Sequence, residues 1–285
     1  MTSRDFDVIA IENPAIDIFH TPENTVLESG GGSGANVVVH LSRLGLKTCL
    51  IGFVGDDDYG HIILEELRKE GVDTERIRKL QGDTRTWTMQ TSPQSYRRIG
   101  RTSGVGVRKL TSKDVEYLNL SKSLYVNLTH SLFEESSAVA DDNGLYIFTS
   151  LQGLSEPHTN LPLLSKRRIK ILFSNKEEAT VEKNYITDVI ENGKTLVVIT
   201  HGAGGCEVYK GNYHERYHGL KVNSIDTVGA GDAFSSGFIY GYFRGWELPE
   251  VCAFANGMGA LATTFYGARS RKISKNEVMS IIKHY

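Results

Sequence analysis

Apolar runs alternate with segments of helical spacing along this chain. The runs have the length of buried strands, and in the other segments apolar residues recur every three or four positions. Strands are predicted at 6–11, 48–54, 123–128, 145–149, 169–174 and 195–200, and helices at 37–44, 61–70, 233–243, 248–264 and 273–285. This alternation is typical of an α/β fold with a mostly parallel sheet that helices cover on both faces.

Two other stretches predict strands of a different kind. Residues 83–99 mix threonines and aromatic residues with polar residues in rough alternation, and 25–27 is a brief apolar segment. Alternation of this kind indicates strands with one face open to solvent. The basic residues Arg97, Arg98 and Arg101 could reach a phosphate or a dimer partner, or could be solvated charges on a strand edge.

Length and composition exclude several classes of protein. The 285 residues suffice for one large α/β domain or two small ones. Hydrophobic residues make up 40% and charged residues 23%, an ordinary globular balance. The net charge of −2 offers no general surface for a polyanion, so no nucleic-acid partner is expected. The apolar runs fall far short of the roughly 18 residues that span a bilayer, so no membrane partner is expected.

The cysteines indicate a reducing environment. Cys49, Cys206 and Cys252 are far apart in the sequence, and no CxxC motif occurs. Residues 1–7 are polar and charged, unlike a secretory leader. We therefore expect reduced thiols in a cytoplasmic protein.

A turn of small residues stands directly before the predicted helix at 233–243. If the helix begins there, the free N–H groups of Gly229, Ala230 and Gly231 and the helix dipole would make a site for negative charge. Asp232 would repel an anion, unless it takes a proton from a hydroxyl while the amides stabilise a phosphoryl group. A capped helix with a glycine-rich turn is the simpler alternative.

The segment 226–234, Asp-Thr-Val-Gly-Ala-Gly-Asp-Ala-Phe, resembles the signature of the ribokinase-like PfkB family of carbohydrate and nucleoside kinases. The resemblance implies one kinase domain over 1–285, a three-layer α/β/α sandwich with a mostly parallel central sheet. It also implies a small β lid formed by about 13–30 and 82–102. In such kinases the Gly-Ala-Gly unit, here 229–231, is the anion hole, and the aspartate, here Asp232, is the catalytic base.

Two earlier segments extend the resemblance to the acceptor site. Asn13-Pro-Ala-Ile-Asp17 follows the first predicted strand, where open α/β sheets bind ligands, although an Asx turn around Pro14 explains it equally well. Gly30-Gly-Gly-Ser-Gly-Ala-Asn36 matches a family segment whose glycines let the substrate approach the backbone. Ser33 departs from ribokinase, where a lysine is usual. The implied substrate-binding residues are Asn13, Asp17, Gly31, Gly32 and Asn36.

Three further segments match the nucleotide side of the family. Asn175-Lys-Glu-Glu178 fits an Asn-x-x-Glu motif that would hold Mg²⁺ through water at Glu178, although an acidic turn that starts a helix is equally consistent. The nucleotide-binding residues that the resemblance implies are Asn175, Thr200, Gly202, Gly205 and Asn256. Asn256 could instead serve helix packing. Asp226 could help bind a monovalent cation such as K⁺, as in some relatives.

Two motifs are present by sequence but lack the expected context. Gly30, Gly32 and Ala35 satisfy a dinucleotide-binding pattern, yet the preceding residues are polar and do not form the first strand of a βαβ unit. His214-Glu-Arg-Tyr-His218 reads as H-E-x-x-H, but glycines bracket it and tyrosines alternate within it. We predict a strand or hairpin there, on which the two imidazoles would be about 13 Å apart, too far to share a zinc ion.

The sequence thus predicts an ATP-dependent, Mg²⁺-dependent kinase. It would transfer the γ-phosphoryl group to a hydroxyl of a small polyhydroxylated substrate, either a sugar, a nucleoside or a cyclic polyol, and a homodimer could form through the lid. The alternative is a catalytically inactive sensor of sugars or nucleosides on the same fold. It would keep Asp17 and Asn36 but not need Asp232.

Overall fold

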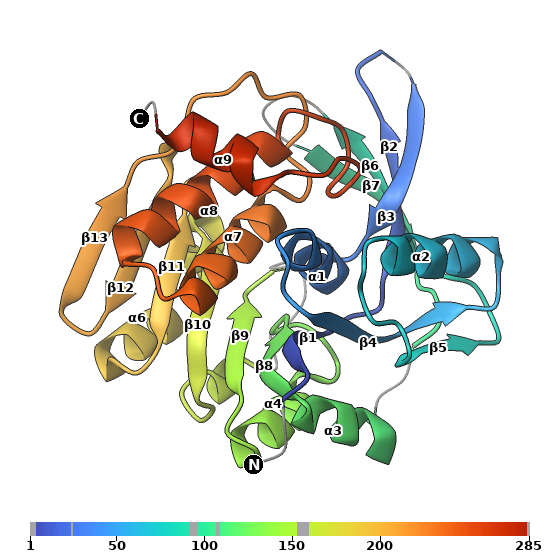
Figure 1. Cartoon of the computed structure of the whole chain (residues 1–285), viewed down its shortest axis with the longest axis horizontal. Helices are drawn as coiled ribbons and strands as arrows, with labels where there is room; N and C mark the ends of the chain where they lie inside the picture. Colours follow the sequence, from blue (N-terminus) through green and yellow to red (C-terminus); the bar gives the residue numbers. More distant parts are fainter. Residues whose placement is uncertain (1–3, 24, 92–95, 107–108, 153–159, 284–285) are drawn as a thin grey trace. The chain divides into compact units, whose positions relative to one another are not determined.

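The computed structural model describes residues 4–23, 25–91, 96–106, 109–152 and 160–283 (Figure 1). The chain forms two compact units, and each is built from separated stretches of sequence. The first unit comprises Met1–Ile11 and Arg108–Gly219, and the second comprises Glu12–Val107 and Leu220–Tyr285. Since the sequence of the first unit interrupts that of the second, residues far apart along the chain meet within the second unit.

The first unit is a mostly parallel sheet with helical connections. Its strands are β1 (Phe6–Ile11), β8 (Ser121–Val126), β9 (Tyr146–Ser150), β10 (Ile169–Asn175), β11 (Leu196–Thr200), β12 (Cys206–Lys210) and β13 (Tyr213–Tyr217), in the order β13-β12-β11-β10-β9-β8-β1. Strands β1 and β8–β11 are parallel, and β12 and β13 are antiparallel. The helices are α3 (Ser112–Asn119), α4 (Phe133–Asp142), α5 (Lys176–Val181) and α6 (Lys183–Asn192), with short 3₁₀ turns at Leu161–Leu163 and Gly202–Gly204.

The second unit combines a helical layer with two groups of strands. Its helices are α1 (Ser33–Arg43), α2 (Asp58–Lys69), α7 (Ala230–Arg244), α8 (Leu248–Ala262) and α9 (Lys275–Ile282), and β4 (Thr48–Gly55) pairs with β5 (Ile77–Leu80) in parallel. Helices α7 and α8 pack closely because glycines lie between them. A Cβ on Gly237 would come within 2.9 Å of the Ala255 Cα. A Cβ on Gly259 of α8 would lie 3.3 Å from the Ala230 carbonyl oxygen, so the packing of α8 extends to the first turn of α7.

A separate four-stranded sheet, called the small sheet below, also belongs to the second unit. It consists of β2 (Ala15–His20), β3 (Val26–Gly31), β6 (Thr86–Thr91) and β7 (Tyr96–Thr102), in the order β3-β2-β6-β7. The buried side chains of Phe19 and Met89 pack against Val228 and Ala268, and Trp87 lies against this cluster. The strands fall within the predicted lid ranges 13–30 and 82–102, except that β3 ends one residue later, at Gly31; positions 24 and 92–95 lie outside the described residues. That this sheet closes over a substrate stays a prediction.

Most predicted elements are confirmed, with shifts at their ends. The strand predicted around the H-E-x-x-H match is β13, which holds His214 and ends before His218. Strand β5 was not predicted, because its four residues, two of them adjacent basic residues, carry little apolar signal. Helix α1 begins at Ser33 instead of 37, since the Glu12 carboxylate accepts the Gly34 N–H at 3.3 Å and stabilises an earlier start. The last predicted helix is confirmed as α9, and positions 284–285 lie outside the described residues.

The three cysteines are buried free thiols, in agreement with the prediction. Within the ranges that the structure describes, no helix is both long enough and apolar enough to cross a membrane.

Candidate active site

The start of helix α7 is shaped by a glycine in the left-handed region. Gly229 is the N-cap residue with φ 74°, and a Cβ there would lie only 2.3 Å from the Ala268 Cβ. No side chain caps the helix. Ala230 N donates to Thr227 O at 3.3 Å, a long bond, and the helix itself supplies no acceptor for the N–H groups of its first turn. The Gly231 N–H is thus one of the amides that could donate a hydrogen bond to a ligand.

Asp232 lies in this first turn, where its carboxylate is held by two residues of helix α1. Ser33 Oγ donates to Asp232 Oδ1 at 2.6 Å, and Asn36 Nδ2 donates to Oδ2 at 2.8 Å. Asp232 is only 4% exposed. Each carboxylate oxygen therefore has a defined side-chain donor, and together the two donors fix the orientation of the carboxylate.

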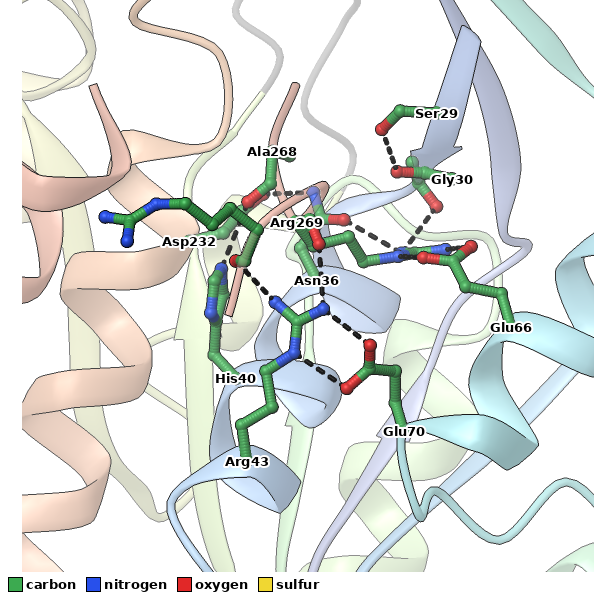
Figure 2. Close-up of polar contacts among 12 residues, drawn as sticks. Ser29, Gly30, Asn36, His40, Arg43, Glu66, Glu70, Asp232, Ala268 and Arg269 are labelled. Atoms are coloured by element: carbon green, nitrogen blue, oxygen red, sulfur yellow. Dashed lines mark hydrogen bonds and ion pairs between the residues drawn. The ribbon is translucent and has the colours of Figure 1, made fainter. Parts of the chain in front are cut away.

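A buried arginine fixes Asn36 in turn (Figure 2). Arg269 Nη1 donates to Asn36 Oδ1 at 2.8 Å and to Gly31 O at 3.1 Å. Its other nitrogens donate to both carboxylate oxygens of Glu66 on helix α2, at 2.9 and 3.2 Å. The Arg269 side chain is completely buried. The orientation of Asp232 therefore depends on a chain of contacts that runs from Glu66 through Arg269 and Asn36.

The glycine run before α1 makes room for these side chains. A Cβ on Gly30 would lie 2.0 Å from Glu66 Oε2 and 2.2 Å from Arg269 Nη2, and a Cβ on Gly31 would lie 2.2 Å from Asp17 Oδ2. Gly32, with φ 92°, is the N-cap of α1. The three glycines thus accommodate an ion pair, a carboxyl group and a left-handed backbone turn.

The carboxyl group of Asp17 is buried beside charges of both signs. Burial raises its pKa from 3.8 to about 7; the Arg269 guanidinium opposes this rise and the Asp232 carboxylate adds to it. Arg98, on strand β7, is a second cation that lowers the pKa. The chemical consequence is a carboxyl group that can gain or lose its proton near neutral pH.

This pKa predicts how stability depends on pH. Between pH 3.8 and about 7 the folded protein keeps the Asp17 proton and the unfolded chain releases it, so stability falls as the pH rises through this window. Asp17→Asn should therefore raise the free energy of unfolding at pH 8 by on the order of 1–4 kcal/mol. Urea unfolding of both proteins at pH 4, 6 and 8 measures this. The difference should grow up to about pH 7 and then level off; a constant difference would contradict the prediction.

Asn13 and Asp226 flank this cluster. Asn13 is buried, and its Oδ1 finds no hydrogen-bond donor among the residues that the structure describes. Asp226 is completely buried and joins two turns, since Oδ1 accepts the Val228 N–H at 3.1 Å and Oδ2 accepts the Gly267 N–H at 3.0 Å. Burial raises the pKa of Asp226. An unsatisfied buried amide oxygen such as that of Asn13 is suited to a ligand that donates a hydrogen bond.

His40 of helix α1 secures the loop that packs on Gly229. Its Nε2 lies 3.1 Å from the Ala268 carbonyl (Figure 2). Burial lowers the pKa of His40 to about 4, so the ring is neutral at physiological pH and Nε2 acts as the donor. The backbone at 268 is thereby held against the start of helix α7.

In the first unit, the structure brings Asn175 and Thr200 together at the carboxyl ends of strands β10 and β11. They are paired neighbours in register. Asn175 and Glu178 form a capping box: Asn175 Oδ1 accepts the Glu178 N–H at 2.8 Å, and Glu178 Oε2 accepts the Asn175 N–H at 3.0 Å. Burial raises the pKa of Glu178. One oxygen of the Glu178 carboxylate is therefore used in capping helix α5, and the other oxygen takes no part in the capping box.

The remaining predicted nucleotide residues have different surroundings. Gly202 is exposed in the 3₁₀ turn after β11, with φ 55°, and a Cβ there would meet open space. A Cβ on Gly205 would lie 2.0 Å from the Tyr217 carbonyl, so close packing on strand β13 already requires a glycine. Asn256 is a buried residue of helix α8 in the second unit. Close packing therefore accounts for the glycine at position 205, whereas Gly202 is exposed to solvent.

Sequence reasoning missed three contributors to this cluster: Arg269, Glu66 and the contact of Ser33 with Asp232. Arg269 and Glu66 are 203 positions apart, so no local pattern connects them. The only available signal was a charged residue directly after Gly267-Ala268, within a segment that matches the end of the family. Ser33 stood out by departing from the usual lysine, but its partner was not apparent.

Comparison with known proteins identifies the family. The model of the pfkB family of carbohydrate kinases matches residues 11–275. The chain belongs to this family. It is therefore a phosphotransferase that acts on a sugar hydroxyl, and ATP binding follows from the family.

Two curated relatives of this pfkB kinase are kinases. An uncharacterized sugar kinase of Archaeoglobus fulgidus is 29% identical over 245 residues, which cover 80% of this chain and 96% of the relative. An ATP-dependent ribose-1-phosphate kinase of Halopiger xanaduensis is 29% identical over 250 residues, with coverage of 85% and 83%. The match thus extends over most of both proteins in each case.

A solved structure confirms the predicted fold. The ribokinase of Arabidopsis thaliana, complexed with ribose and ATP, superposes with a TM-score of 0.84 over 98% of this chain and 99% of that chain, at 19% identity. This similarity shows that the pfkB kinase described here has the ribokinase-like fold.

Proposed function

We propose that this pfkB kinase transfers the γ-phosphoryl group of ATP to a hydroxyl of a small sugar or related polyhydroxylated acceptor, with Asp232 as the general base. The observation that carries the proposal is the geometry of Asp232. Its carboxylate is buried, oriented by Ser33 and Asn36, and placed in the first turn of an uncapped helix. A base and a set of amide donors on one helical turn suit deprotonation of a hydroxyl beside a phosphoryl group.

The proposed reaction is a single displacement. The acceptor oxygen attacks the γ-phosphorus, the bond from this phosphorus to the β,γ-bridging oxygen breaks, ADP leaves, and Asp232 takes the hydroxyl proton. Amides at 229–231, with Gly231 N–H as the clearest donor, would stabilise the charge on the transferring group. In this arrangement positioning and electrostatics supply the rate acceleration.

Acceptor binding is assigned to the polar groups around Asp17. Asn13 Oδ1 would accept a hydrogen bond from an acceptor hydroxyl, which would satisfy a buried oxygen that has no donor among the described residues. Asp17 would accept a second. Asn36 would use its remaining N–H, while Gly31 and Gly32 keep the backbone close to the acceptor. The small sheet would act as the lid and exclude water, which competes as a nucleophile.

The nucleotide is assigned to Asn175, Thr200, Gly202, Gly205 and Asn256. Mg²⁺ would be held through water by Glu178, and this donor suits it: Mg²⁺ prefers carboxylate oxygen, keeps several waters and binds mainly to the phosphates. The ion would neutralise charge on the nucleotide phosphates. For K⁺, the family resemblance points to Asp226, although its carboxylate oxygens each accept a backbone N–H already. Those contacts favour a structural task for Asp226.

The relatives support a sugar as the acceptor and ATP as the donor. The Halopiger relative is named for ATP and ribose 1-phosphate, and the Arabidopsis ribokinase was solved with ribose and ATP. Both names fit an acceptor that is a pentose or a derivative of one. We extend that class to this chain as a proposal.

A screen of ATP consumption tests the proposal. The intact protein with Mg²⁺ would be incubated with pentoses, hexoses, nucleosides, inositols, sugar phosphates and sugar acids, and mass spectrometry would identify the product. Acceptor-dependent ADP formation with one new phosphomonoester is the expected result. Tight binding of one compound without turnover of any would contradict the proposal and favour the sensor.

A further inference from the structure

We propose that Ser33 is itself a phosphorylation site, and that the protein transfers the γ-phosphoryl group of ATP to the Ser33 hydroxyl when no acceptor is bound. This inference rests on the proposed function, because it uses the same base and the same phosphoryl donor. Three features of the second unit support it: the contact between Ser33 and Asp232, the residues that fix Asp232, and the two helix ends that meet at this contact.

The Ser33 hydroxyl holds the position that the proposed mechanism requires of an acceptor. Ser33 Oγ donates to Asp232 Oδ1 at 2.6 Å, within the short range of a hydroxyl bonded to a carboxylate. A general base must lie about 2.6–3.2 Å from the atom whose proton it takes. Ser33 and Asp232 meet this requirement, although 199 positions separate them in the sequence. The fold thus places an alcohol directly at the proposed base.

The base is held by a third residue, as it is beside activated serine nucleophiles. Asn36 Nδ2 donates to Asp232 Oδ2 at 2.8 Å, and Arg269 Nη1 fixes Asn36 by donating to its Oδ1 (Figure 2). A serine becomes nucleophilic when an adjacent base is within hydrogen-bond reach and a further group orients that base. Ser33, Asp232 and Asn36 have this arrangement.

There is open space for a phosphoryl group beside this contact. Ser33 is half-buried, and Gly231, directly before Asp232, is exposed. A Cβ on Gly231 would meet no atom within 4 Å among the described residues. The amides of 229–231, where the transferring phosphoryl group is proposed to bind, are therefore accessible next to the residue that holds the Ser33 hydroxyl. A phosphoryl group at these amides would have the Ser33 oxygen as a neighbouring nucleophile.

Two helix N-termini meet at the contact, and both favour negative charge. Ser33 is the first residue of α1, Asp232 lies in the first turn of α7, and neither N-cap residue caps its helix with a side chain. A phosphoserine at a helix N-terminus gains charge-assisted hydrogen bonds from backbone N–H groups. The Glu12 carboxylate takes the Gly34 N–H of α1, so the amides of α7 are the better donors. A phosphorylated Ser33 would thus be stabilised where it forms.

The transfer step is the one proposed for an acceptor, with Ser33 in its place. Ser33 Oγ attacks the γ-phosphorus, the bond from this phosphorus to the β,γ-bridging oxygen breaks, and ADP leaves. Asp232 takes the hydroxyl proton and, once protonated, can donate a hydrogen bond to the new phosphate. The phosphate on Ser33 would then occupy the acceptor position at Asp232. The modified protein would be inactive toward acceptors, and a bound acceptor would protect Ser33 by using the same base.

Intact-protein mass spectrometry after incubation with Mg²⁺ and ATP, without any acceptor, tests the inference. The protein is first treated with a phosphatase, which is removed before ATP is added. We expect a gain of one phosphoryl group per chain, located at Ser33 by peptide fragmentation, at a rate that does not depend on protein concentration. The gain should be absent in Ser33→Ala and about 10²- to 10⁴-fold slower in Asp232→Asn.

Ser29→Ala is the matched control. Ser29 is also half-buried and lies four positions before Ser33, but its hydroxyl donates to the Gly30 carbonyl at 3.1 Å. Its replacement should leave the phosphoryl gain unchanged. No gain in wild-type protein, or a gain at a residue other than Ser33, would overturn the inference. A rate that rises with protein concentration would also overturn it, since one chain would then modify another.

The acceptor screen separates this inference from the proposed function. If the screen finds an acceptor while Ser33 stays unmodified in its absence, the inference fails and the kinase proposal stands. If Ser33 is modified and no compound is phosphorylated, the proposal of a small-molecule acceptor fails and Ser33 remains the site. When both reactions occur, the acceptor at about ten times its Kd should slow the modification about 10-fold. An unchanged rate of modification would show that Ser33 and the acceptor do not share Asp232, and would overturn the inference.

Discussion

Asp232→Asn is expected to lower kcat by about 10²- to 10⁴-fold, the usual contribution of a general base. The amide has the shape of the carboxylate and can still accept from Asn36 Nδ2, so the fold and the acceptor site should persist. It cannot take the hydroxyl proton. Steady-state kinetics with the acceptor found in the screen, together with the Kd of that acceptor from calorimetry, measure the two effects separately.

Asp58→Asn is the matched control for this change. Asp58 is also an acidic residue in the first turn of a helix, α2, and it is exposed. Its replacement loses only a helix-dipole interaction, worth about 0.3–1 kcal/mol, and should leave kcat unchanged. A rate for Asp232→Asn within a few-fold of wild type would remove Asp232 from the role of base. If Asp232→Asn no longer bound the acceptor in calorimetry, Asp232 would be assigned to acceptor binding instead.

Arg269→Met is expected to lower the free energy of unfolding by about 3–5 kcal/mol. The substitution leaves the Glu66 carboxylate without its bidentate partner and Asn36 Oδ1 and Gly31 O without their donor. The cost arises because two buried acceptors lose their donor and because the Glu66 carboxylate, whose side chain is 27% exposed, stays partly desolvated without its partner. Urea unfolding monitored by circular dichroism gives the difference directly.

Helix α2 offers an exposed pair as the control. Glu65 and Lys69 form an ion pair 3.9 Å apart, with side chains 69% and 79% exposed. Lys69→Ala should therefore change stability by no more than about 0.5 kcal/mol. If Arg269→Met were equally mild, the contact chain to Asp232 would not depend on Arg269. Adding Glu66→Gln to Arg269→Met should recover part of the loss, because no partly desolvated charge is then left unpaired.

The sequence predicted the elements whose apolar pattern is strong, and it failed where tertiary contacts decide. The apolar runs that became β4 and β11 fixed those strands nearly to the residue. The start of α1 was placed four residues late, because the signal for it is a carboxylate contributed from Glu12, outside the helix. Strand β5 forms because it pairs with β4, and the local sequence of Ile77–Leu80 does not predict this pairing.

The candidate site shows the same division. The Gly-Ala-Gly-Asp segment carries its chemistry within four consecutive residues, so sequence reasoning reached Asp232 and its helical position. The glycines of 30–32 were interpreted as space for a substrate, whereas in the structure they also make space for Asp17, Glu66 and Arg269. A glycine in the sequence does not show which neighbouring side chain occupies the space beside its Cα. A bulge at Ile99 of strand β7 was equally hidden, because a shift of register depends on the partner strand.

The interrupted sequence of the second unit has a consequence for its synthesis. Ser33 and Asn36 precede their partner Asp232 by 199 and 196 positions, and Asn36 precedes Arg269 by 233. At about 5–20 residues per second, a ribosome needs roughly 10–40 s to bridge the first of these gaps. The residues of 108–219 are made entirely within that interval, so the first unit can fold while the glycine run and α1 wait for their partners. A chain whose synthesis stops before residue 226 would therefore have a folded first unit and an incomplete second unit that lacks Asp232. We expect chaperones and proteases to act on that incomplete unit.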